Sequence, residues 1–279
     1  MFFNPYVEVI LAGIIWATTG IFIKILSLPS TTITFFRLAV PTLVLLVYLS
    51  WKRVPLNKAT NKILLFASLL NAARMFLYFL AFTLTSIGNA VIMLYTWPIF
   101  AVILSALFLK EMLTMKKCFL LLLALIGIIT MFSNQTLSFK SNDVLGMLAM
   151  LLSSLLYAAT IPIFKKQLAH FSKPETIFCQ NVVGAIVFFP FLFINKPFPT
   201  FPQFTIASFY AILIGLIGFV LFFSGLQQLK ASTASLLTYS EPLSAIVFGA
   251  IILKEGITLN MIIGGGIILI VSYIVRRAE

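Results

Sequence analysis

One apolar pattern occurs twice in this chain, half a length apart. The two segments read YTWPIFAVILSALFLKE and YSEPLSAIVFGAIILKE. Their shared positions lie at one offset, since 239 − 95 and 255 − 111 both equal 144, and this offset pairs Tyr95, Pro98, Lys110 and Glu111 with Tyr239, Pro242, Lys254 and Glu255. A second pair of segments, GIIWATTGIFIK and SLLYAATIPIFK, pairs Trp16 with Tyr157 and Lys24 with Lys165. The chain is therefore predicted to be a duplication of one helical unit.

Composition places this duplication in a membrane. Hydrophobic residues make up 61% of the chain, charged residues 9%, and the mean hydropathy is +1.12. A soluble domain carries about 25% charged residues, so lipid is the expected solvent. The apolar start, MFFNPYVEVILAGIIWATTG, has no basic region before it and is interpreted as a first spanning helix, not as a cleaved signal.

The predicted fold is an all-α membrane protein whose apolar runs are separated by turn or charge clusters. A spanning helix needs about 20 apolar residues, and ten runs qualify, near 7–26, 32–51, 62–83, 86–109, 117–133, 144–164, 175–194, 204–226, 232–253 and 258–276. The repeat divides them into two five-helix domains, 7–133 and 144–276. Because five is odd, the second domain must enter the membrane from the opposite side, which predicts inverted-topology repeats.

The net charge of +12 supports this topology. If the N-terminus is cytoplasmic, 13 lysines and arginines fall on inside segments and four, Lys24, Lys140, Lys196 and Lys254, fall outside. Cytoplasmic loops are enriched in Lys and Arg, so both termini are predicted to be cytoplasmic. The basic residues sit in short loops and form no groove or motif for nucleic acid.

The chain resembles the EamA-type drug/metabolite transporter family. The resemblance lies in the ten predicted spans, in their division into two halves, and in an apolar helix of each half that has a central Pro and ends in Lys-Glu. The dipeptide Glu241-Pro242 also resembles the signature of its second half, whereas Trp97 stands at the matching place in the first half. The resemblance implies a central cavity, alternating access and small organic solutes. It implies a cell-membrane location (the inner membrane in bacteria) and allows a homodimer through the fifth and tenth helices.

Arg74 lies near the middle of the third predicted span. Placing Arg there costs about 2.5–3.5 kcal/mol on insertion scales, so its side chain is expected to face the bundle interior. Asn71, Arg74 and Tyr78 are spaced i, i+3 and i+7 and share one helix face. We expect Arg74 to bind an anionic group such as a substrate carboxylate. A structural ion pair, or an Arg bonded to backbone carbonyls, that locks two helices is the alternative. Arg37, nearer a span end, is expected to anchor at the interface, with a functional role as its alternative.

Glu241 is the only acid near a span centre, and Pro242 follows it. Proline removes a backbone donor and disturbs the preceding turn, so Pro98 and Pro242 are predicted bending points for gating. Three roles remain open for Glu241, which are pairing with Arg74, binding a substrate amine, and taking up a coupled proton. A helix-packing hydrogen bond at the bend is the structural alternative.

Aromatic and amide side chains complete the predicted site. Aromatic rings at cavity depth can enclose a planar or cationic solute, although most aromatic residues here must face lipid or neighbouring helices. Symmetry of the repeat and polar stripes on the spans select the candidates Trp16, Tyr95, Trp97, Tyr157, Tyr239 and Gln227.

No cofactor, metal or catalytic residue is predicted. Cys118 and Cys179 are too far apart in sequence for a paired metal motif, and His170 lies in a charged loop without ligand-spaced partners. The chain contains no P-loop pattern, so gradients or exchange would supply the energy.

The predicted function is gradient- or exchange-driven transport of a small organic metabolite, an amino acid or a related zwitterion, by alternating access, and the protein is not expected to be an enzyme. A lipid or lipid-linked sugar flippase is the alternative, and an intramembrane enzyme is the third reading. Such enzymes cluster His, Asp or Cys near one membrane face, and these spans do not.

Overall fold

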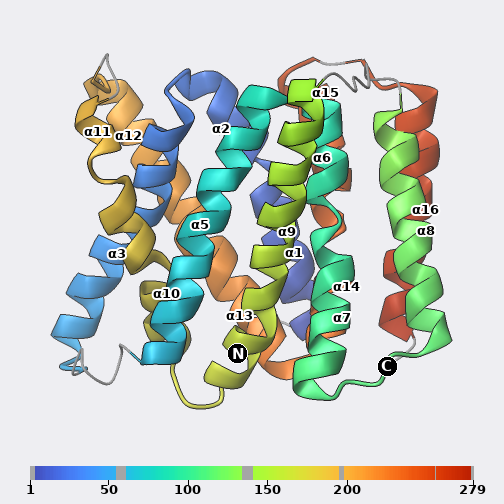
Figure 1. Ribbon diagram of the computed structural model, residues 1–279, viewed down its shortest axis with the longest axis horizontal. Coiled ribbons are helices and arrows are strands. Elements are labelled where there is room, and N and C mark those ends of the chain that lie inside the picture. Colours follow the sequence, from blue (N-terminus) through green and yellow to red (C-terminus); the bar gives the residue numbers. More distant parts are fainter. Residues whose placement is uncertain (1–3, 55–60, 134–140, 195–197, 255, 278–279) are drawn as a thin grey trace.

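The computed structural model describes residues 4–54, 61–133, 141–194, 198–254 and 256–277. Every regular element in these ranges is a helix, and the helices run between two ends of one bundle (Figure 1). Helix α1 begins and α16 ends at the end drawn lowest in Figure 1, which we call the lower end. Lys58, Lys140, Lys196 and Glu255, used above in the charge count and the repeat, lie outside the described residues.

The helices of the first half follow the predicted spans within a few residues. They are α1 (Pro5–Ala17), α2 (Thr19–Leu26), α3 (Ser30–Trp51), α5 (Lys62–Leu84), α6 (Ile87–Leu94), α7 (Trp97–Leu109) and α8 (Met115–Phe132). Those of the second half are α9 (Ser141–Gln167), α10 (Lys173–Phe188), α11 (Phe191–Ile194), α12 (Phe201–Tyr210), the π-helix η1 (Ala211–Gly218), α13 (Phe219–Gln228), α14 (Ala231–Leu237), α15 (Ser240–Ile252) and α16 (Leu259–Arg277).

Eight helical stretches in the described residues are long and apolar enough to cross a membrane. A ninth, Leu259–Val275, is shorter. The seventh predicted span is divided into α10, which has 16 residues, and the four-residue α11. Pro190 stands between them and cannot donate a backbone hydrogen bond. A multi-span all-helical protein is confirmed, whereas the number ten stays a prediction.

Three spans are interrupted near mid-length. Thr18 separates α1 from α2, and its hydroxyl donates to the Ile15 carbonyl at 2.7 Å. The pairs Tyr95–Thr96 and Thr238–Tyr239 separate α6 from α7 and α14 from α15. The last two breaks lie just before Pro98 and Pro242, which lack the N–H that would continue the helix.

The helices pack through small residues and long side-by-side contacts. Helix α5 lies along α9, α3 along α10, and α8 along α16, with the last pair at one edge of the bundle (Figure 1). A Cβ added at Gly264 would overlap the Gly127 carbonyl oxygen. Glycine thus lets the backbones of α8 and α16 approach closely, as in other membrane helix pairs.

Candidate functional site

A cavity of about 550 Å³ lies between the two halves of the sequence. Its walls come from α1, α2, α5, α6 and α15, and α3, α8 and α16 each add one residue, Ser30, Phe132 and Met261. The mouth of the cavity is lined by exposed residues near the ends of these helices, among them Lys24, Gly256 and Ile257. The cavity therefore opens at the upper end of the bundle.

A smaller recess of about 90 Å³ lies deeper and holds the charged side chains. It shares Trp16, Tyr78 and Glu241 with the larger cavity and adds Arg37 and Arg74. Two guanidinium groups and one carboxyl group thus meet in an aromatic enclosure. In the described residues, no salt bridge joins Glu241 to either arginine.

Arg74 is held in place by a chain of hydrogen bonds. Its Nε donates to Asn71 Oδ1 at 3.0 Å, and Asn71 Nδ2 donates to the Gln180 carbonyl of α10 at 3.1 Å. The guanidinium carbon lies 4.1 Å from the ring centre of Tyr157, a cation–π contact. The side chain is only 7% exposed, so these contacts replace water and leave the terminal guanidinium nitrogens for a ligand.

Arg37 does not anchor at the interface as expected. Its guanidinium carbon lies 5.8 Å from the ring centre of Phe219, and its Nη1 donates to Met75 Sδ at 3.2 Å. These contacts hold the side chain inside the bundle, beside the recess. The position of Arg37 near a span end did not reveal the direction of its side chain, because this direction depends on which face of α3 meets η1 and the adjoining Phe219.

Glu241 occupies the first turn of α15. The positive end of the helix dipole favours a carboxylate in that position. The backbone N–H of Glu241 donates to the Thr238 carbonyl at 2.9 Å. In a regular helix that carbonyl would accept from residue 242, but Pro242 has no N–H to donate. The break before Pro242 therefore both exposes the carboxylate to the cavity and satisfies the backbone around it.

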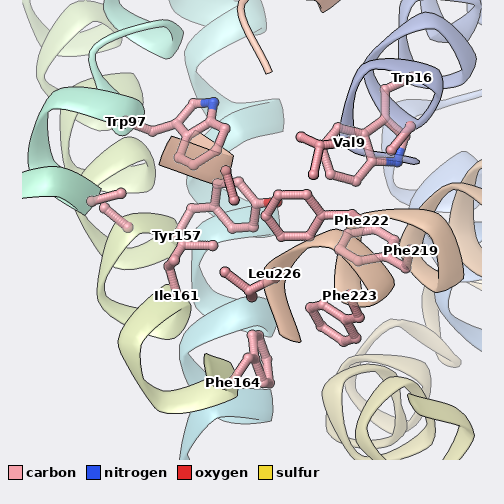
Figure 2. Packing of buried hydrophobic residues seen from close by; sticks show 14 of the residues in the cluster. Val9, Trp16, Trp97, Tyr157, Ile161, Phe164, Phe219, Phe222, Phe223 and Leu226 are labelled. Atoms are coloured by element: carbon pink, nitrogen blue, oxygen red, sulfur yellow. The ribbon is translucent and has the colours of Figure 1, made fainter. Parts of the chain in front are cut away.

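Aromatic rings form the floor and continue toward the lower end (Figure 2). The ring of Trp97 meets that of Tyr157 at 4.7 Å and 62°, and Trp16 meets Phe219 at 5.1 Å. Below them, Phe164 packs on Phe223 with ring centres 5.2 Å apart. This layer, which we call the aromatic plug, extends from the recess to Phe164, one residue before Lys165 of the lower end.

Two charged contacts hold the lower end together. Lys165 Nζ donates to the carbonyls of Leu226, Gln227 and Leu229 at 2.6, 3.0 and 2.7 Å. A cation suits these positions because the carbonyls at a helix C-terminus lack intrahelical partners. The second contact involves the Lys-Glu motif of the first half. The Glu111 carboxylate accepts hydrogen bonds from the backbone N–H groups of Ala231 and Ser232 at 2.7 and 3.0 Å.

The structure divides the predicted site residues into two groups. Eight of the candidates line one or both cavities, namely Trp16, Arg74, Tyr78, Tyr95, Trp97, Tyr157, Glu241 and Pro242. The other four lie elsewhere. Asn71 is buried behind Arg74, Pro98 is buried in α7, and Gln227 donates to the Leu168 carbonyl near the lower end. Tyr239 is fully buried, and its hydroxyl donates to the Tyr95 carbonyl at 3.0 Å.

Sequence reasoning missed several wall residues. Thr19 and Tyr210 join Arg37 and Phe219 in the recess. Tyr210 lies just before η1, and π-helical turns are often found at functional sites because they redirect side chains. No residue pattern announces a π-helix, so only the neighbouring Gly215 and Gly218 offered a signal, and Gly215 lies against the Arg37 carbonyl.

The fold and the cavity define a class, a multi-pass membrane protein with a charged, aromatic pocket reached from one end. A model described as the EamA-like transporter family matches residues 5–133 and again 144–277. The chain belongs to this family.

Several proteins similar to this chain are named as transporters. The uncharacterized transporter YoaV of Bacillus subtilis is 27% identical over 92% of this chain and 91% of its own length. The pseudopaline exporter CntI of Pseudomonas aeruginosa is 28% identical over 60% of this chain and 57% of its own length, and mouse solute carrier family 35 member G1 is 22% identical over 94% and 75%. A solved crystal structure has a TM-score of 0.85 at 15% identity, covers 99% of this chain and 98% of its own, and shows the fold alone.

The family and these names establish a transmembrane transporter and not an enzyme, with a small-molecule substrate and a membrane environment. Among the described residues no group of three or more His, Cys, Asp and Glu side chains is placed to hold a metal ion.

Proposed function

We propose that the protein is a secondary transporter that moves a small zwitterionic metabolite of the amino-acid class by alternating access. One observation carries the proposal. Arg74 and Glu241 line the same recess without forming a salt bridge with each other. Buried membrane charges are costly and are usually paired or functional, and a substrate with one carboxylate and one amine supplies a partner for each.

The walls suit the rest of such a substrate. Tyr78, Tyr95, Trp16 and Tyr157 border the charged groups, and aromatic faces attract ammonium groups as well as apolar side chains. Asn71 acts through Arg74, because its amide fixes the guanidinium at 3.0 Å. In this proposal Asn71 positions the binding group, and Tyr239 and Gln227 support the helices around it.

Alternating access requires two conformations that open at opposite ends. We interpret 7–133 and 144–276 as inverted halves, which supply the two conformations by exchanging their roles. Matched backbone features support this interpretation. Lys110 and Lys254 both take left-handed backbone angles, with φ of 56° and 55°, and both follow the helix after a proline break. Pro98 and Pro242 are then the bending points.

The lower end is assigned to the cytoplasm of a cell with the transporter in its inner or plasma membrane. Lys52, Arg53, Lys62, Lys165 and Lys166 belong to helix ends or turns at this end (Figure 1), in agreement with the enrichment of basic residues on the cytoplasmic side. The cavity then opens outward. A coupled proton or an exchanged solute would act at Glu241, the one acid of the recess.

A lipid or lipid-linked sugar flippase is the second candidate, favoured by one observation. Phe132, Ile246 and Met261 extend the upper cavity toward the α8–α16 pair at the edge of the bundle. An apolar tail could lie along this wall while a polar head occupied the recess. Scrambling of fluorescent lipids in vesicles tests this candidate separately.

Counterflow in proteoliposomes tests the main proposal. Purified protein is reconstituted with an unlabelled amino acid inside, and uptake of the same labelled compound is measured across a panel of acidic, neutral, basic and aromatic amino acids. We expect saturable counterflow for at least one zwitterion, and loss of it in Arg74→Ala. Arg53→Ala removes the same charge outside the cavity and should behave as wild type. No counterflow for any amino acid would reject the proposal.

A further inference from the structure

The recess carries more positive than negative charge. Its lining contains Arg37, Arg74 and Glu241 and no other Asp, Glu, Lys or Arg among the described residues. With all three ionised, the formal charge of the recess is +1. A zwitterion of zero net charge would use one guanidinium and the carboxylate, and it would leave the second guanidinium without a counter-charge.

Arg37 is the guanidinium that lacks strong partners. A guanidinium has five N–H donors and no acceptor. One donor of Arg37 meets the thioether sulfur of Met75 at 3.2 Å, a weak acceptor, and its Nε is buried without a hydrogen-bond partner. Arg74, by contrast, already has its Nε satisfied by Asn71. The unsatisfied Nε and the contact with Phe219 leave Arg37 poised for a further acceptor.

A carboxylate is the acceptor that fits best. Arg binds carboxylates through two parallel N–H···O bonds, and the match is worse for a neutral amide or hydroxyl. Inside a low-dielectric enclosure an unpaired charge is penalised strongly. An additional acidic group on the substrate would therefore satisfy both the charge and the donors of Arg37.

We propose that Arg37 and Arg74 together form a two-guanidinium subsite, and that the transported zwitterion carries a second acidic group and a net charge of −1. The class is an amino dicarboxylate, with the ammonium at Glu241 and one acidic group at each arginine. This inference rests on the proposed function, since it assigns the substrate class of the same recess.

The experiment compares probes of equal size and different charge. Dissociation constants of L-glutamate and L-glutamine, and of L-aspartate and L-asparagine, are measured on the purified full chain by ligand-induced thermal shift. In the wild type the acid of a pair should bind about tenfold or more tightly than its amide, because a hydrogen bond to a charged partner adds that much. Arg37→Gln should remove the preference, and Arg37→Lys should restore part of it.

Arg53→Gln is the matched control, since it changes the same charge in an exposed turn after α3. Melting of each variant without ligand shows whether it is folded. If Arg37→Gln does not fold, the intermediate preference of Arg37→Lys decides the matter.

Three results would overturn the inference. The first is equal or tighter binding of the amides, and the second is an acid preference that survives Arg37→Gln. The third is counterflow of neutral amino acids with no response to either acid, which leaves the proposed function standing. Absence of counterflow for every amino acid, acidic or neutral, removes the proposed function and this inference together.

Discussion

The two ends of the bundle contain matched residues in different arrangements. Lys165 and Lys24 lie 141 positions apart at equivalent places in the repeat. At the lower end Lys165 caps three carbonyls at the end of α13, whereas at the upper end Lys24 is exposed at the mouth of the cavity. Phe164 packs into the aromatic plug, and its counterpart Ile23 lines the open cavity. One pattern of residues thus accompanies both a closed and an open end.

The backbone of the matched spans also differs between the closed and the open end. Helix α9 is continuous from Ser141 to Gln167, whereas its repeat counterpart is divided at Thr18 into α1 and α2. The side chain of Trp16 on the divided span lies beside the cavity. Because the two spans have similar sequences, closure of an end depends on how its span packs and bends.

The largest effect on transport is expected from a substitution in the recess, which lies between the two ends of the bundle. In the proposed site, Arg74→Ala removes the guanidinium assigned to the substrate carboxylate and leaves Asn71 Oδ1 without its donor, so transport should fall about a hundredfold or more. Counterflow in proteoliposomes measures the change, and Arg53→Ala serves as the control. Wild-type transport by a folded Arg74→Ala variant would remove Arg74 from the substrate site.

Lys165→Met should open the lower end. It deletes three charge-assisted hydrogen bonds to the end of α13, each of which contributes about 1.5–3 kcal/mol, so the closed form should lose about tenfold or more in population. The measure is the labelling rate of Ser224→Cys by an impermeant maleimide added from the lower side, in protein whose Cys118 and Cys179 are replaced.

The adjacent Lys166→Met is the control, because Lys166 is exposed. An equal labelling rate in both variants would show that Lys165 does not hold the lower end closed.

Glu111→Gln should have a smaller effect at the same end. Glutamine keeps one acceptor for the N–H groups of Ala231 and Ser232 but loses the charge that favours a helix N-terminus, worth about 0.3–1 kcal/mol. The labelling rate of Ser224→Cys should rise about twofold to fivefold. Glu175→Gln is the control and should leave the labelling rate unchanged, because the contacts of Glu175 lie within the start of α10. If Glu111→Gln also leaves the rate unchanged, Glu111 does not help to close the lower end and only the contacts of Lys165 do.

The smallest effect concerns the break before Pro98. The Ser154 hydroxyl donates to the carbonyls of Met93 and Leu94 at 3.0 and 2.9 Å, and Pro98 cannot bond to the second. Ser154→Ala should therefore lower the free energy of unfolding by about 1 kcal/mol, seen as a lower melting temperature in detergent. Ser208→Ala, at a half-exposed position in α12, is the control, and equal melting would contradict this account of the break.

The sequence predicted the helices well because each apolar run is bounded by charges or turn residues. It also predicted both breaks before Pro98 and Pro242, because proline acts on its own backbone. It did not predict the break at Thr18, whose segment contains neither proline nor a turn cluster, or the π-helix before Phe219.

The candidate site was predicted in part, again where a local feature of the sequence marks the residue. Arg74 and Glu241 stood out because charge is rare inside a span. The direction of Arg37, and the burial of Tyr239 against the Tyr95 carbonyl, depend on which helix faces meet. That information lies in the packing of distant segments and not in local spacing.

The most direct test of alternating access measures both ends in one set of experiments. Spin-label pairs are placed at repeat-matched exposed positions, Ile25 with Ile252 at the upper end and Lys166 with Phe108 at the lower end. Distances are recorded with and without the amino acid that gives the highest counterflow. We predict that the upper distances shorten while the lower distances lengthen. A transported substrate that leaves both distances unchanged, or moves both in the same direction, would contradict the account.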